Sequence, residues 1–259
     1  MKYYVVADVH GFFSELDKAL TNAGFFSDKL PNKLIICGDL LDRGSQPNEL
    51  CSFLERLLAE DRLILIRGNH EDLMLDLMDR IDYYNDFGID RTHHYHNGTV
   101  STLLKMTYSE GFDLAFRPER VINKMKNTTF YKKLLPACQD YFETDNYIFV
   151  HGYIPCYFEG RPNSAKNLRY NPNWRNASKE EWENARWING MVACAEGVKE
   201  EGKTIVFGHY RSSFGHAVFE GKVNPDGSDD NSPYYADGII ALDSNTARSG
   251  EINCVVIED

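Results

Sequence analysis

Short apolar runs that end in polar loops recur along the first quarter of the chain. The runs are KYYVV, KLIIC and RLILI, and each leads into a loop rich in aspartate, histidine or glycine. Amphipathic patterns lie between them: one places Phe12, Leu16, Ala19 and Ala23 on a single helical face, and Pro47 suits the first turn of the next helix. This repetition of strand, loop and helix predicts an α/β sheet with parallel strands.

A long, mostly helical pattern follows from residue 71 to about residue 135, interrupted by the segment RTHHYHNGT. Apolar runs typical of strands then return in NYIFVHG, KTIVFGH, GIIALDS and EINCVVI. Two segments rich in Asn, Pro and Gly, residues 158–175 and 221–233, are predicted to be loops. We therefore predict one domain over residues 1–259, with a helical insertion at about residues 72–135.

Five of the predicted strands end in a loop with metal-binding chemistry. The loops are DVHG at residues 8–11, GDLLDRG at 38–44, GNHE at 68–71, HG at 151–152 and GH at 208–209. Ligands of such sheets bind beyond the carboxyl ends of the strands, so the five loops are expected to converge on one rim. A lone histidine at a strand end is more often structural, and only the combination points to a site.

Carboxylate, imidazole and amide oxygen together make a mixed ligand set that suits Mn, Fe, Zn, Co or Ni. No thiolate accompanies them, which argues against a structural zinc site. The chain has 259 residues, 42% of them hydrophobic, enough to build a core. Its net charge of −11 argues against an extended nucleic-acid interface, but a small phosphorylated substrate held by a few arginines and a metal remains compatible with it.

The six cysteines form no CxxC pair, which indicates buried free thiols in a reducing compartment. The apolar run at residues 3–7 is too short for a signal peptide, and no run reaches membrane-spanning length. We therefore expect a cytoplasmic protein that does not bind membranes, and the sequence leaves its oligomeric state open.

The ordered motifs D-x-H-G, G-D-x-x-D-R-G, G-N-H-E, H-G and G-H resemble those of the calcineurin-like metallophosphoesterases. The forms D-R-G and R-G-N-H-E resemble the phosphoprotein phosphatase branch, which includes the bacteriophage lambda-type and bacterial serine/threonine protein phosphatases and the symmetrical diadenosine tetraphosphate hydrolases. HNGTVSTL resembles the N-G-G-x-x-T-L stretch of that family. The resemblance covers almost the whole chain. It implies a layered α/β fold, with a central β-sandwich of mixed sheets flanked by helices and a helical cap insertion.

The resemblance also implies two divalent metal ions, Mn foremost, with Fe, Zn, Co or Ni as alternatives. In such enzymes two metals roughly 3.5–4 Å apart polarise the phosphoryl oxygens and activate a bridging hydroxide, which attacks phosphorus in line. No covalent phospho-enzyme and no cysteine nucleophile is then needed. The implied ligands are Asp8 and His10 for the first metal, Asp39 as the bridge, and Asn69, His151 and His209 for the second.

By the same resemblance His70 protonates the leaving alkoxide, oriented by Asp42. A neighbouring carboxylate raises the pKa of a histidine and fixes its tautomer, which suits a general acid near pH 7. The alternative is that His70 and Asp42 form an ordinary surface pair. Glu71 is expected to be a helix N-terminal carboxylate and not a catalyst.

Arg43 and Arg67 are predicted to bind phosphate, because both flank metal-binding loops and guanidinium groups bind phosphate in a bidentate manner. Surface salt bridges are the alternative. The family usually supplies a further phosphate-facing arginine before the last histidine motif. In this chain that region contains NARWINGM, so Arg186 is the candidate.

Three segments depart from the family pattern: HGYIP brings Tyr153 close to the fourth motif, GHY contains Tyr210, and DSNTARSG begins at Asp243. We expect these differences to change the shape of the pocket and not the metal binding. A further group of histidines stands in the predicted insertion and is expected to be exposed to solvent in a loop: His93, His94 and His96.

These features favour a metal-dependent phosphoesterase whose substrates are phosphoserine and phosphothreonine in proteins. The alternative is hydrolysis of diadenosine tetraphosphate or another nucleotide phosphoanhydride. In that case an adenine would lie against the aromatic side chains of Tyr153, Tyr157, Phe158 and Trp174. A non-catalytic scaffold is the least favoured hypothesis, because every matched ligand position is filled.

Overall fold

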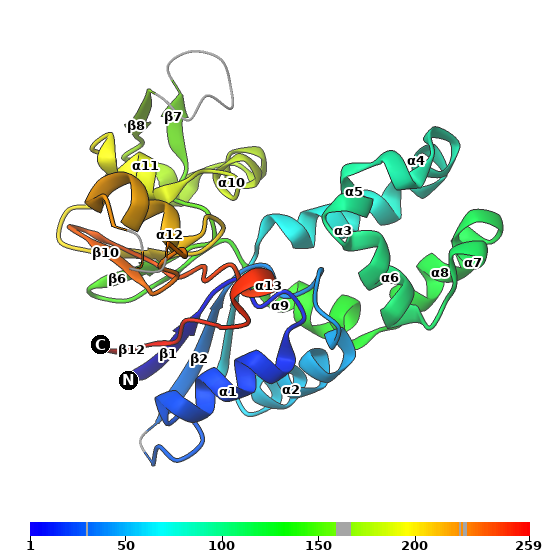
Figure 1. Cartoon of the computed structure of the whole chain (residues 1–259), viewed down its shortest axis with the longest axis horizontal. Coiled ribbons are helices and arrows are strands. Elements are labelled where there is room, and N and C mark those ends of the chain that lie inside the picture. The colour runs from blue at the N-terminus through cyan, green and yellow to red at the C-terminus, as the bar shows by residue number, and fades with distance from the viewer. Residues whose placement is uncertain (30, 159–166, 223, 225–226) are drawn as a thin grey trace.

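Two mixed β-sheets pack face to face at the centre of the computed structural model, which describes residues 1–29, 31–158, 167–222, 224 and 227–259 (Figure 1). The first sheet has the order β12-β1-β2-β3-β4, with β1 to β4 parallel and β12 antiparallel to β1. Its strands are β12 (Val255–Glu258), β1 (Lys2–Val6), β2 (Asn32–Cys37), β3 (Leu63–Ile66) and β4 (Cys138–Gln139).

The second sheet has the order β10-β11-β9-β6-β5, and its three central strands are parallel to one another. Its strands are β10 (Tyr234–Ala236), β11 (Ile239–Ala241), β9 (Thr204–Phe207), β6 (Tyr147–Phe149) and β5 (Phe142–Glu143). A separate hairpin joins β7 (Cys156–Phe158) to β8 (Leu168–Tyr170). The strand β8 was not expected, because it lies within the predicted loop at residues 158–175, part of which lies outside the described residues.

Alternation along β1 shows why the chain forms a sandwich. Tyr3 and Val5 point into the core between the sheets, where they meet Phe149 and Val206 of the second sheet. Tyr4, which lies between Tyr3 and Val5, points to the other face and belongs to the core under the helices. Side chains of a strand alternate between faces, so a strand that is apolar throughout is buried on both sides.

Helices cover the outer faces of the sandwich. The first sheet is covered by α1 (Phe13–Ala23) and α2 (Pro47–Ala59), and the second by α10 (Lys179–Ala185) and α11 (Gly190–Ala195). Short helical segments complete this part: η2 (Phe130–Leu134), α9 (Leu135–Ala137), η3 (Trp174–Asn176), α12 (Ser212–Gly215), η4 (His216–Glu220) and α13 (Thr246–Ser249). The predicted layered α/β fold with mixed sheets between helices is confirmed.

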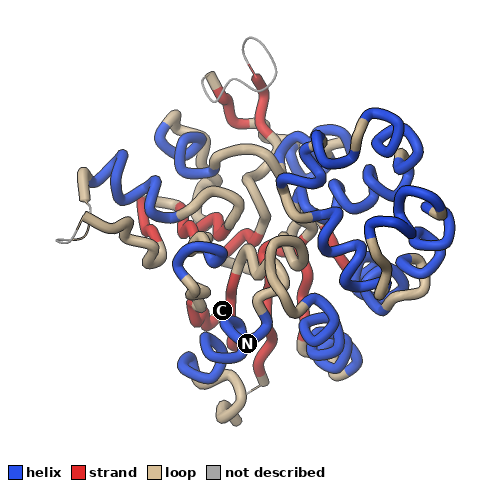
Figure 2. The backbone as a smooth tube through the Cα atoms, turned by 45° about the vertical axis from the view of Figure 1, so that its right-hand side comes forward, coloured by secondary structure: helices blue, strands red, loops and turns tan. Residues whose placement is uncertain are grey.

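The segment predicted as an insertion is helical and gathers to one side of the sheets (Figures 1 and 2). It consists of α3 (Asn69–Asp79), α4 (Ile81–Phe87), η1 (Ile89–Arg91), α5 (His93–His96), α6 (Thr99–Thr107), α7 (Gly111–Phe116) and α8 (Pro118–Met125). No helix of the described residues is both long and apolar enough to cross a membrane.

Candidate active site

The five polar loops meet because the strands that carry them are parallel within each sheet and the two sheets are packed together. Hydrogen bonds join the loops directly. The amide of His10 donates to the carbonyl oxygen of Asp39 at 2.9 Å, and that of Gly208 donates to His151 at 2.9 Å. The amide of His209 donates to the carboxylate of Asp8 at 2.9 Å, which links the second sheet to the first.

The backbone of these loops is strained. Ten described non-glycine residues have positive φ, and six of them lie in these loops: Asp8, His10, Asp39, Asp42, Arg43 and His209. L-residues rarely adopt this left-handed region, and when they do the surrounding structure must hold them there. Such strain gathers at functional sites, so the backbone marks the same loops as the motifs do.

Glycines of the motifs let these loops approach one another. A Cβ atom on Gly208 would overlap the carboxylate of Asp8, and one on Gly68 would overlap that of Asp39. Both acidic side chains therefore need a neighbour without a side chain. The glycines of GNHE and GH set the distance between loops and provide no chemistry of their own.

Two histidines present the same ring nitrogen to the centre of the site. His10 Nδ1 lies 2.9 Å from the carbonyl oxygen of Leu41, and His151 Nδ1 lies 2.8 Å from that of Cys37. Donation of Nδ1–H to these carbonyls assigns the lone pair of each neutral ring to Nε2. Burial lowers the pKa of both rings, that of His10 to about 3, which favours the neutral form. Metal-binding histidines are commonly oriented in this way.

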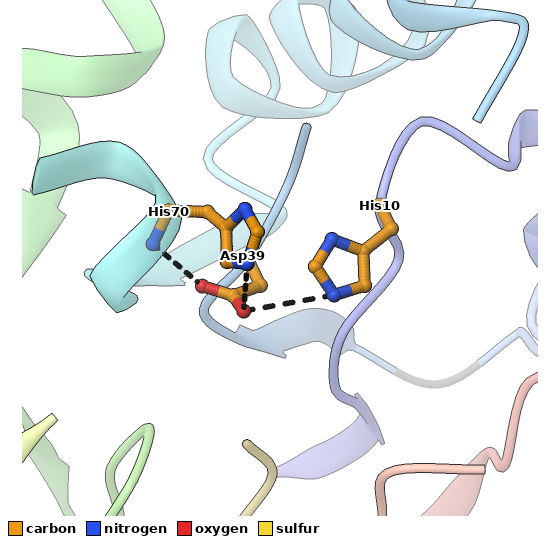
Figure 3. Close-up of side chains that lie close together, drawn as sticks. All are labelled: His10, Asp39 and His70. Atoms are coloured by element: carbon orange, nitrogen blue, oxygen red, sulfur yellow. Dashed lines mark hydrogen bonds and ion pairs between the residues drawn. The ribbon is translucent and has the colours of Figure 1, made fainter. Parts of the chain in front are cut away.

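The carboxylate of Asp39 faces both His10 and His70 (Figure 3). This carboxylate is 3.6 Å from His10 Nε2, 3.3 Å from His151 Nε2 and 3.8 Å from His70 Nε2. Donor atoms of Asp39 and His151 also lie close enough to those of His209 to share one ion.

The atoms that face one another at the centre are acceptors. Asn69 Oδ1 lies 2.8 Å from His151 Nε2, with the ring proton of His151 already engaged at Cys37. Asp8 is buried, and burial together with the charges of Asp243 and Asp39 raises its pKa well above the ordinary value. A set of lone pairs and carboxylates with too few protons among them fits divalent cations. Four of the six predicted ligands fall in two clusters that could bind metal: His10 and Asp39 together with His70, and Asp39 with His151 and His209. The other two, Asp8 and Asn69, lie beside these clusters through their contacts with His209 and His151.

His70 and Asp42 lie next to this group, and both are buried. His70 Nδ1 is 2.7 Å from Asp42 Oδ2. Burial acts to lower the pKa of His70, but the carboxylates of Asp39 and Asp42 outweigh this effect, so that the pKa of His70 is raised above its ordinary value. The alternative of an ordinary surface pair is therefore wrong, because neither partner reaches the surface.

The three predicted arginines differ in their partners. Arg43 lies at the site, with Nη1 2.7 Å from His10 Nε2 and Nη2 3.2 Å from His70 Nε2. Arg67 donates Nε–H to Asp72 at 2.7 Å, and Arg186 donates to the other oxygen of the same carboxylate at 2.6 Å. Arg67 and Arg186 thus converge on one acid, and phosphate would have to compete with Asp72 for both.

Glu71 and Asp243 have contacts that the sequence analysis did not foresee. Glu71 is buried and accepts from the amides of Gly68, Asp39 and Leu40, so it is the expected helix N-terminal carboxylate and also fixes the Asp39 loop. Burial raises the pKa of Glu71 to about 7 and that of Asp243 to about 6. Asp243 lies close enough to Asp8 to raise its pKa, and only the late family motif pointed to it.

Two aromatic expectations need correction. Tyr153 is buried, its hydroxyl donates to the carbonyl oxygen of Val198 at 2.7 Å, and it packs against Phe207, so it does not line a pocket. Trp174 is fully buried and cannot hold an adenine. By contrast, Tyr210 is 40% exposed with its ring 4.9 Å from that of His209. Trp187, which the sequence analysis missed, is 50% exposed and 5.6 Å from the same ring.

The histidines of the insertion do not all lie in solvent. His93 and His96 are exposed as expected. The prediction is wrong in two respects, because His94 is fully buried and the three histidines lie in the short helix α5 and not in a loop. His94 Nε2 lies 3.0 Å from Asp76 Oδ2, and ligand atoms of Asp76, His93 and His94 are close enough to hold an ion. The hydroxyl of Tyr84 also donates to Asp76, so this carboxylate is satisfied by the protein itself.

Comparisons with known proteins agree with this arrangement. The family described as calcineurin-like phosphoesterase matches residues 1–238. Serine/threonine-protein phosphatase 1 of Salmonella typhimurium is 42% identical over 73 residues, 28% of this chain and 31% of that protein. The symmetrical bis(5'-nucleosyl)-tetraphosphatase of Actinobacillus succinogenes is 38% identical over 71 residues, 27% of this chain and 24% of that protein. Each match thus spans less than a third of the curated relative.

A crystal structure of a cold-active protein-tyrosine phosphatase of a psychrophile Shewanella shares the fold. The TM-score is 0.51 at 17% identity, over 100% of this chain and 75% of that one. At this level of identity the likeness concerns the arrangement of helices and strands alone.

Proposed function

This chain belongs to the calcineurin-like phosphoesterase family, and from that premise we propose that it hydrolyses phosphoserine and phosphothreonine side chains of proteins. The chain is a hydrolase by its family, so a non-catalytic scaffold is set aside. The observation that carries the proposal is the pairing of a buried His70–Asp42 couple with acceptor atoms that face one another around Asp39. The sequence identity of 42% over 73 residues with a serine/threonine-protein phosphatase supports the choice of substrate.

The metal ligands we propose are Asp8 and His10 for one ion, Asp39 for both, and Asn69, His151 and His209 for the other. Divalent metals bound there would supply Lewis acidity and lower the pKa of bound water. We propose manganese as the native metal, although the ligand set accepts others. The Nδ1–H bonds of His10 and His151 to backbone carbonyls keep their rings in place whichever metal is present.

His70 is the proposed general acid. Because its Nδ1–H bonds to Asp42, the second proton of the imidazolium is on Nε2, the nitrogen that faces Asp39. From there it can pass to the oxygen of the leaving serine or threonine, which is a poor leaving group without a proton. Arg43 contacts both His10 and His70, so we propose that it binds the phosphate between them.

A turnover panel with added Mn²⁺ tests this proposal. The purified chain is given phosphoserine, phosphothreonine and phosphotyrosine peptides, p-nitrophenyl phosphate, a cyclic phosphodiester and a set of dinucleotides. Release of phosphate from the phosphoserine and phosphothreonine peptides is the expected result. Failure on those peptides and on p-nitrophenyl phosphate would contradict the proposal.

The alternative substrate is diadenosine tetraphosphate or a related nucleotide, and one observation favours it. The exposed rings of Trp187 and Tyr210 flank His209, where a base could stack on either of them. Similarity to a symmetrical tetraphosphatase points the same way. Chromatography of the dinucleotide products decides: adenosine diphosphate among them supports the alternative, and its absence removes it.

A cytoplasmic location is part of the same proposal. All six cysteines lie in the described residues and none of them forms a disulfide. Free thiols are usual in a reducing compartment such as the cytoplasm. Localisation of the tagged chain by cell fractionation tests it.

A further inference from the structure

One contact from the helical insertion reaches the proposed general-acid couple. The hydroxyl of Thr99 donates to Asp42 Oδ2 at 2.8 Å, the oxygen that also accepts from His70 Nδ1 at 2.7 Å. Thr99 and Asp42 are both buried. Thr99 is the first residue of α6, Asp42 follows β2 and His70 is the second residue of α3, so three separate segments meet at one oxygen.

The other oxygen of Asp42 has no hydrogen-bond partner among the described residues, although it is buried. Both hydrogen bonds of this carboxylate therefore fall on Oδ2. If one of them were lost, the carboxylate could rotate and the direction of the His70 ring would be less firmly fixed. Asp42 also has positive φ, so its backbone conformation needs support from its surroundings.

The residue before Thr99 packs closely against the loop that contains Asp42 and Arg43. Gly98 has a φ of +90°, and a Cβ atom there would lie 2.7 Å from the amide nitrogen of Arg43. In the family motif that HNGTVSTL resembles, the position of Thr99 is a second glycine, which has no hydroxyl. Relative to that stretch the hydroxyl of Thr99 is an addition, and it brings α6 into contact with Asp42.

We propose that Thr99 is a positioning residue: it holds Asp42 Oδ2 toward His70, so that His70 delivers its proton to the leaving oxygen. This inference rests on the proposed phosphomonoesterase function and names a part of the insertion that serves it. A positioned general acid matters most when the leaving group is basic and little when it is acidic. Substitution of Thr99 should therefore lower kcat by different factors for substrates that differ only in their leaving group.

The test compares hydrolysis of phenyl phosphate, with the more basic leaving group, and p-nitrophenyl phosphate under saturating Mn²⁺. We expect Thr99→Val to lower kcat about 10-fold on phenyl phosphate and only about 2-fold on p-nitrophenyl phosphate, with KM nearly unchanged. Thr99→Ser keeps the hydroxyl and should restore both rates, whereas Thr99→Gly should behave as Thr99→Val does.

Thr107→Val is the matched control, because this buried hydroxyl donates to the carbonyl oxygen of Leu103 within α6 and not to Asp42. This substitution should leave kcat on both substrates unchanged, and circular dichroism should show that all variants are folded. Equal losses on the two substrates, no loss in Thr99→Val, or no rescue by serine would each overturn the inference. Wild-type protein that is inactive on both substrates would overturn the proposed function as well, and this outcome is distinct from the other three.

Discussion

Two groups of side chains, both of which contain histidine and aspartate, differ in how their hydrogen-bond acceptors are satisfied. In the proposed active site, Asn69 Oδ1 faces the lone pair of His151. In the insertion, the carboxylate of Asp76 receives hydrogen bonds from Tyr84 and His94 and lies 3.4 Å from Nη1 of Arg80. The first group contains acceptors that face each other and fits cations, whereas the carboxylate of the second is already satisfied by donors, although Nδ1 of His94 has no hydrogen-bond partner among the described residues.

The comparison shows that clustering alone does not identify a metal site. The backbone makes the same distinction: Asp39, His10 and His209 have positive φ, and none of Asp76, His93 and His94 does. Strain is held where geometry must be fixed for function.

The largest effect is expected for Asp39→Asn. This change removes a charge that three imidazoles face, so bound metal should fall and kcat should drop by more than about 100-fold, beyond the range usual for outer-shell partners. Metal content is measured by elemental analysis and turnover with p-nitrophenyl phosphate. Unchanged metal and unchanged turnover would show that Asp39 is not the shared ligand.

His70→Gln should lower kcat on phenyl phosphate by roughly 10²-fold or more, as expected for loss of a general acid. The metal content of the protein should stay the same, because His70 is proposed to carry a proton and not a metal. This variant separates the two roles that the motif GNHE combines. Loss of metal in His70→Gln would assign His70 to the metal shell instead.

Asp76→Ala tests the saturated group of the insertion. Hydrogen bonds from Tyr84 and His94 would be lost, at a cost of about 1–3 kcal/mol in the free energy of unfolding. Turnover and metal content should remain within about 2-fold of wild type, because the group is proposed to hold no metal. Urea unfolding and elemental analysis measure the two quantities. A fall in bound metal would show that the two groups are alike after all.

The smallest expected effect is on stability at low pH, and it concerns Glu143, whose carboxylate is paired with the side chains of an arginine and a lysine. Glu143 receives hydrogen bonds from Arg175 and lies beside Lys203, which lowers its pKa to about 2. A carboxylate with a depressed pKa stabilises the fold above its unfolded pKa of about 4.3 and loses that contribution as pH falls toward 2. Glu143→Gln should therefore flatten the dependence of stability on pH between these values and leave turnover at neutral pH unchanged. Thermal melts from pH 5 to pH 2 measure this, and parallel curves for both proteins would contradict it.

Much of the fold and the core of the site could be predicted from the sequence. Apolar runs of four to six residues specify β1, β2, β3 and β9, and the motifs at their ends supply the proposed ligands. The strands that were missed, such as β4, β5 and β8, have only two or three residues. A run of that length has no usable periodicity, and the neighbouring strand decides its conformation.

The rest of the site depends on tertiary contacts that no local pattern contains. The sequence could not show that Thr99 reaches Asp42, since 57 positions separate them. Nor could it show on which side of the sheet Tyr153 lies: two residues after His151, its ring belongs to the core, while Trp187 from a distant segment stands beside His209. Motifs indicated the chemistry, and packing determined what surrounds it.

The most direct test of the central claim is a metal titration of chelator-stripped protein. Metal-free protein is titrated with Mn²⁺ while bound metal and hydrolysis of p-nitrophenyl phosphate are measured together. The proposed ligand set predicts that metal-free protein does not hydrolyse the substrate and that hydrolysis appears as bound metal rises to a plateau at two ions per chain. In Asp39→Asn, neither the plateau nor the hydrolysis should appear. Hydrolysis by metal-free protein, or a plateau that survives Asp39→Asn, would contradict the account.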